Sequence, residues 1–198
     1  MKYYLKQFSF PFVYLIFMSL VAFAISAIGN DVLEIVLYVA CIGLYTALMI
    51  MSNFKEGQEA RKILHSNDLE RRYMVEHGEL RDIRPHEEYK PWKGFLFGIV
   101  TSAPLILCML VHLILFFATG GTSNQAGAVA AIIYMLFYAP FESVLSVTVG
   151  SHYFMLLYVV AYLALVMGIP YILGAKKMQK TYDVIAEKQT IIYGENKK

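Results

Sequence analysis

The chain has 198 residues, of which 58% are hydrophobic and 16% are charged, and its mean hydropathy is +0.53. This composition is too apolar for an ordinary water-soluble domain and indicates a protein that crosses a lipid bilayer. The formal net charge is only +2, and the basic residues are mixed with acids and belong to no recognisable nucleic-acid-binding module. We therefore expect no nucleic-acid partner.

The positions of the basic residues predict the topology. Nine of the 17 Lys and Arg lie between Asn53 and Lys93, and the other eight lie in the first six residues or after the last apolar run. Cytoplasmic segments of membrane proteins carry an excess of Lys and Arg, so we expect all three zones on the cytoplasmic side. The prediction is a multi-pass protein of the cell membrane with both termini in the cytoplasm.

Residues 7–52 are predicted to form a transmembrane hairpin. The apolar run from Phe8 to Ile28 is long enough to cross a bilayer, so we expect a retained first helix; a cleaved signal peptide is the alternative. A second run, from Val32 to about Ser52, follows a tight turn at Gly29, in which Asn30 or Asp31 is suited to cap the helix. The short connection predicts an antiparallel pair.

Residues 53–93 are predicted to be a charged cytoplasmic linker. We expect a helix break at Ser66-Asn67-Asp68, where Asn67 and Glu70 have the spacing of a capping box. A short amphipathic helix would then end at Gly78. The apolar stripe of that helix has two interpretations: it packs against the membrane ends of other helices, or it docks a cytosolic partner on residues 60–84.

Two prolines, Pro85 and Pro91, predict extended chain in the rest of the linker, before an aromatic and basic collar at the level of the lipid head groups. The run His86-Glu87-Glu88 lacks the second histidine of a zinc-protease helix and the arginine spacing of an intramembrane protease. We interpret it as solvated charge.

The third predicted span runs from Gly94 to about Ala118. Gly94, Gly98 and Ser102 repeat at intervals of four residues, so that one face of the helix is nearly bare backbone. Small residues at this spacing allow two membrane helices to approach closely, and we predict a helix-packing face there. Pro104 is expected to kink the helix one turn further on.

Residues 119–150 are predicted to form an outer segment with two short helices that bend at Pro140 and dip into the outer leaflet. The third span and the last span, about Ser151 to Gly174, already return the chain to the cytoplasmic side, so a further full crossing would place the basic tail outside. A five-span protein with an outer C-terminus is the alternative. The tail, 175–198, has a pattern compatible with a helix or with a short terminal strand.

Taken together, these elements predict an all-α polytopic integral membrane protein that forms a single membrane domain over 1–198. It would have four transmembrane helices, with the third and fourth within 94–174, and the bent, re-entrant segment between these two. Cys41 and Cys108 fall inside predicted spans, so we expect no disulfide between them.

Three ionisable residues, His112, Glu142 and His152, are predicted to meet beneath the outer surface. An ionisable group inside a bilayer is costly and seeks a partner. A pair of imidazoles with a carboxylate is suited to proton coupling or to binding Zn²⁺. The alternative is a neutral histidine with a local hydrogen bond and an interfacial glutamate, with no cofactor.

The sequence contains no recognisable catalytic motif. The run Gly150-Ser151-His152 offers a serine beside a histidine but no oxyanion-hole context or third partner. We therefore expect a non-catalytic protein: a scaffold, regulator or accessory subunit of a membrane assembly, with another membrane subunit or a second copy as its partner. The alternative is a component of a membrane transporter, a permease or a substrate-binding subunit, with a polar site near the outer face.

Overall fold

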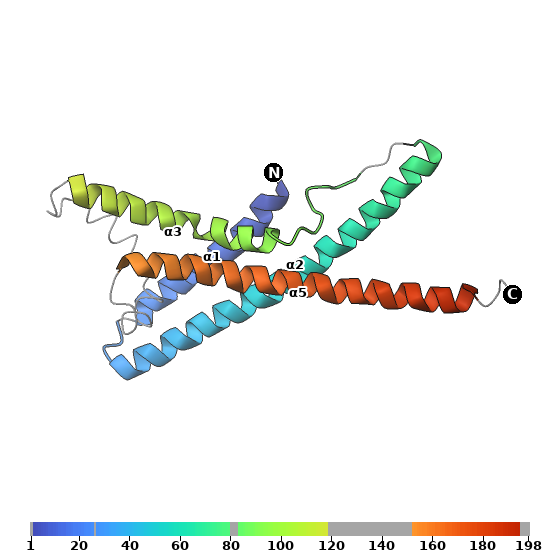
Figure 1. The fold of residues 1–198 in the computed structure, drawn as a ribbon. Coiled ribbons are helices and arrows are strands. Elements are labelled where there is room, and N and C mark those ends of the chain that lie inside the picture. Colours follow the sequence, from blue (N-terminus) through green and yellow to red (C-terminus); the bar gives the residue numbers. More distant parts are fainter. Residues whose placement is uncertain (1, 26, 80–82, 119–151, 195–198) are drawn as a thin grey trace.

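The computed structural model describes residues 2–25, 27–79, 83–118 and 152–194, and contains only helices, turns and connecting chain over these ranges. The helices are α1 (Lys2–Ile25), α2 (Asp31–His77), α3 (Lys93–Ala118) and α5 (His152–Gly194) (Figure 1). The predicted all-helical class is confirmed for these residues. The predicted re-entrant segment at 119–150 lies outside the described residues.

Two of the helices contain stretches that are long and apolar enough to cross a membrane, within Val32–His77 and Leu157–Gln189. The other two contribute shorter apolar stretches, Ser9–Ala22 and Lys93–Leu107. By length and composition alone, the two longer stretches are compatible with a membrane protein.

The helices alternate in direction. α1 and α3 run one way and α2 and α5 the other, so that the C-terminal ends of α1 and α3 lie at the same end of the molecule as the N-terminal ends of α2 and α5 (Figure 1). α5 packs against both α2 and α3. One stripe of α5 is fully buried, and its residues are spaced four apart, as expected for one face of a helix: Val159, Leu163, Met167 and Tyr171.

Both ends of α2 carry the caps that the sequence predicts. At its start the Asn30 side-chain oxygen accepts a hydrogen bond from the Leu33 N–H at 3.1 Å. At its end Gly78 adopts a left-handed conformation, with φ of 68°, and its N–H donates to the carbonyl of Met74. These two predictions are confirmed.

The predicted break at Ser66-Asn67-Asp68 is wrong. α2 continues without interruption for 47 residues, and the predicted short amphipathic helix is its C-terminal part. Ser, Asn and Asp each lower helix stability by only a few tenths of a kcal/mol relative to Ala. The Asn67 side chain does not cap a helix but bonds to the linker, as described below. The tail, left open between helix and strand, is helical to Gly194.

Glycines set the closest contacts of α5. A Cβ atom on Gly57 of α2 would overlap with the carbonyl oxygen of Tyr171, and one on Gly174 would overlap with the carbonyl oxygen of Phe54. The two backbones therefore touch where α2 and α5 cross. On α3, a Cβ on Gly98 would lie 2.5 Å from the Cα of Ala164. The small-residue face of α3 is thus turned toward α5.

Candidate functional site

Two of the three residues predicted to form the outer polar site lie on described helices. His112 belongs to the second half of α3, and His152 is the first residue of α5. Their side chains, and the whole of Glu142, lie outside what the structure describes. The cluster remains a prediction. Within the described part of the chain, no group of three His, Cys, Asp or Glu side chains could hold a metal ion.

The most developed polar site of the described residues lies where the linker packs on α2. We call it the junction: Arg61, Asn67 and Arg71 of α2, Glu88 and Tyr89 of the linker, and Lys93 at the start of α3. It gathers charged and amide side chains along the charged C-terminal half of α2. Several of these side chains are buried away from water. Their hydrogen bonds within the protein therefore take the place of the hydrogen bonds that water would otherwise supply.

Glu88 is the centre of the junction. The residue is only 7% exposed, and its carboxylate accepts a hydrogen bond from the Asn67 side-chain nitrogen at 2.8 Å and forms a salt bridge with Arg71. The Asn67 oxygen in turn accepts from the backbone N–H of Arg84 at 3.4 Å. The interpretation of His86-Glu87-Glu88 as solvated charge is therefore wrong for Glu88, because a return of the linker onto α2 buries it.

Lys93 anchors the other end of the linker. The residue is 1% exposed, and its ammonium donates to the backbone carbonyls of His86 and Glu88, each at 2.6 Å. Burial lowers the pKa of Lys93, the neighbouring Lys90 lowers it further, and the acids Glu88, Glu56 and Glu87 oppose the shift. The Lys93 side chain thereby closes the turn that leads into α3.

An aromatic layer joins the linker to both long helices. The ring of Tyr89 stacks on that of Tyr171, with centroids 5.5 Å apart, and the guanidinium of Arg61 lies 5.8 Å from the Tyr89 centroid. Arg61 also donates to the Gln179 side-chain oxygen of α5. Burial raises the pKa of Tyr89, and Arg61 opposes this shift. Arg61 therefore connects α2, the linker and α5.

The junction can hold three segments in a fixed arrangement, but its groups are not arranged for a reaction. Its carboxylate, guanidinium and ammonium groups are engaged with one another or with backbone carbonyls. General acid–base or nucleophilic catalysis needs such a group to face a space for a reactant. We assign the junction a structural role.

Two features of this region were missed in the sequence. Gly57 stands inside the charged segment Lys55-Glu56-Gly57-Gln58, where it costs an exposed helix about 1 kcal/mol relative to alanine. A glycine at such a position is a sign of close backbone packing. The pairing of Asn67 with Glu88 carries no local signal, because the two residues are 21 positions apart.

No known family model, curated protein or solved structure matches this chain.

Proposed function

We propose that the protein is a non-catalytic scaffold or accessory subunit that crosses the membrane four times and holds a cytosolic partner. In this arrangement α1, α3 and the N-terminal halves of α2 and α5 lie in the bilayer. Two observations support this arrangement. The four helices alternate in direction, as successive membrane crossings do. They also expose apolar side chains along their length, and lipid-facing surfaces are apolar. The three basic zones then share the cytoplasmic side.

One observation carries the docking role: α2 and α5 extend well past the rest of the molecule and diverge (Figure 1). α2 has 47 residues and α5 has 43, so they are about 70 and 64 Å long, roughly twice the thickness of a bilayer core. Half of each helix would therefore lie in the cytoplasm. The stacked rings of His65 and Tyr182, 4.2 Å apart, join the two helices just before they separate.

We call the C-terminal ends of these helices, beyond the junction, the arms: residues 72–77 of α2 and 183–194 of α5. Both arms carry exposed apolar side chains among their charges, including Val75, which is 86% exposed, and Val184, which is 48% exposed. From Asp183 to Gln189 every side chain is exposed. Apolar groups in water on two helices that splay apart are suited to receive a partner between them or along them.

The experiment is purification of the whole protein from its native membranes in a mild detergent, with the mass of the complex measured by light scattering. We expect a partner in a fixed molar ratio. The double variant Val75→Asp/Val184→Asp should release it, because charge in an apolar contact is unfavourable. The same variant should keep the parent's melting temperature, since both positions are exposed.

The matched control is Glu76→Ala/Glu187→Ala, which changes exposed neighbours on the same arms without adding charge to an apolar patch. This control should keep the partner. An unaccompanied protein, or a partner that stays bound to the double aspartate variant, would contradict the docking role.

A further inference from the structure

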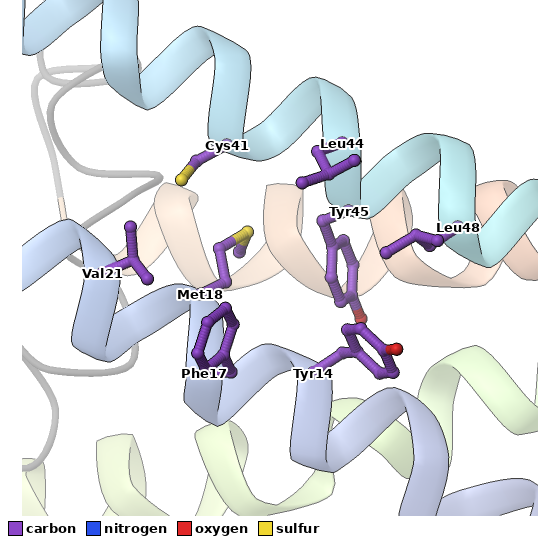
Figure 2. A pocket seen from close by; sticks show the side chains of 8 residues that line it. All are labelled: Tyr14, Phe17, Met18, Val21, Cys41, Leu44, Tyr45 and Leu48. Atoms are coloured by element: carbon purple, nitrogen blue, oxygen red, sulfur yellow. The ribbon is translucent and has the colours of Figure 1, made fainter.

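An apolar cavity of about 150 Å³ lies between α1 and α2 (Figure 2). Four side chains from each helix line it, among them Tyr14 and Phe17 of α1 and Leu44 and Tyr45 of α2, and none of the described lining side chains is charged. Inside a bilayer, an acyl chain gains only van der Waals contact in such a cavity, because the lipid around it is equally apolar. The cavity therefore does not select one lipid head group over another.

The outer face of α5, in contrast, joins apolar and basic side chains in one row. Six residues, each three or four positions from the next, share this face: Leu165, Ile169, Leu173, Lys176, Lys177 and Lys180. The three apolar side chains are each about half exposed, and the three lysines are exposed. We call these six residues the α5 row.

The packing of α5 leaves the apolar part of the row uncovered. Leu165, Ile169 and Leu173 each follow a member of the buried stripe of α5 by two positions, which is about 200° around the helix. They therefore point away from the neighbouring helices. From Leu165 to Leu173 the row extends roughly 12 Å, which fits within the roughly 15 Å of hydrocarbon in one leaflet. In the proposed topology this is the cytoplasmic leaflet, with the lysines at its surface.

The lysines are placed at the end of this apolar surface. Side chains of a helix lean toward its N-terminus, so the lysine side chains extend back toward Leu173. The Lys177 ammonium lies 5.6 Å from the centroid of the Phe54 ring of α2, a contact that does not neutralise its charge. Within the described part of the chain, no carboxylate forms a salt bridge with the three lysines. Asp183, further along α5, accepts a hydrogen bond from Gln179 at 2.7 Å.

Three positive charges beside an apolar surface complement a lipid that is negatively charged. A phosphate accepts charge-assisted hydrogen bonds from ammonium groups, and a head group without a cation of its own leaves the phosphate to the lysines. We propose that the α5 row binds an anionic phospholipid of the cytoplasmic leaflet, with the phosphate on the three lysines and one acyl chain along the three apolar side chains. This inference rests on the proposed membrane topology and is independent of the partner held by the arms.

The test is native mass spectrometry of the full-length protein in detergent, titrated with phosphatidylglycerol, phosphatidylethanolamine and phosphatidylcholine of identical chains. We expect phosphatidylglycerol to bind about tenfold more tightly than the two zwitterionic lipids. Lys177→Gln/Lys180→Gln should lower this preference to about twofold, because one ammonium of three remains. Higher ionic strength should also reduce the preference of the parent, since salt screens exposed charges.

The matched control is Lys62→Gln/Lys188→Gln, which removes the same charge from exposed positions outside the row. It should keep the preference of the parent. If the site variant does not fold, Leu173→Glu, which places a carboxylate beside the lysines at an exposed position, should abolish the preference instead. Equal affinity of the parent for all three lipids, an unchanged preference in the folded site variant, or an equal loss in the control would overturn the proposal. Displacement of the lipid by glycerol phosphate would also overturn it, because the site would then bind a soluble anion.

These outcomes are separable from those of the docking experiment. Loss of the lipid preference in a parent protein that still holds its partner through the arms contradicts the lipid site alone. Loss of the partner with the lipid preference intact contradicts the docking role alone. A site variant that releases the partner and keeps its lipid preference would show that the lysines contact protein and not lipid.

Discussion

The carbonyl oxygen of Tyr171 lies only 2.0 Å from the position that a Cβ atom on Gly57 would take. Gly57→Ala should therefore force α2 and α5 apart and lower the free energy of unfolding by about 1–3 kcal/mol, as expected for overpacking. Thermal melting in detergent measures this change. The same helix supplies its own control, Gly43, which has nothing within 4 Å of its Cβ position. Gly43→Ala should be neutral or slightly stabilising; equal effects at the two sites would exclude a tight crossing.

Gly98→Leu is expected to disrupt the packing of α3 on α5. A Cβ alone would lie 2.5 Å from the Cα of Ala164, and backbone cannot move aside as a side chain can. We expect a loss of at least about 2 kcal/mol, measured as a lower melting temperature in the same detergent. Leu107→Ala, at a position on α3 that is 62% exposed, is the comparison and should have a small effect. A Gly98→Leu protein as stable as the parent would show that this face is not packed.

The bond between Asn67 and Glu88 should hold the linker on α2. Glu88→Ala leaves a buried amide without its acceptor, which costs about 1–3 kcal/mol. Because the two side chains interact directly, Asn67→Ala and Glu88→Ala together should cost less than the sum of the single changes. Proteolysis of the linker should accelerate in both single variants. Glu87→Ala, which removes only a partly exposed contact to Arg84 at 3.6 Å, serves as the control.

Stability should depend on pH through Lys93. Burial places its pKa in the folded protein below its ordinary value of 10.5, so the unfolded chain binds more protons between these two values. The free energy of unfolding contributed by this group therefore rises with pH across that window. Measured as parent minus Lys93→Met, the difference should increase from neutral pH toward pH 10.5. A difference that is flat or falls with pH would mean that the pKa is not lowered.

The topology has a direct test. Reporter fusions at Lys62 and at Lys198 should both be active on the cytoplasmic side, because all basic zones are assigned there. A C-terminus accessible from outside would mean that residues 126–150 cross the membrane completely.

Local patterns predicted the parts of this fold that depend on neighbouring residues. The caps at Asn30 and Gly78 follow from backbone chemistry over a few positions, and both are present. The break at Asn67 was wrong because the hydrogen-bonding partner of that side chain, Glu88, comes from a distant part of the chain. The burial of Glu88 and Lys93 was missed for the same reason. A local charge pattern cannot reveal that the linker folds back onto α2.

The unbroken course of α2 has a mechanical consequence. No proline interrupts it, and its backbone contact with α5 lies at Gly57, 26 residues from Asp31 and 20 from His77. The helix can therefore pivot as one rigid body at Gly57, near its middle. About 39 Å of helix lies on the N-terminal side of this contact and about 30 Å on the C-terminal side. In the proposed topology, a rigid-body tilt of the membrane half of α2 about Gly57 would move the cytoplasmic end in the opposite direction by about three-quarters as much. Under that topology, a force applied to α2 on one side of the bilayer would displace its end on the other side without any change in the helix itself.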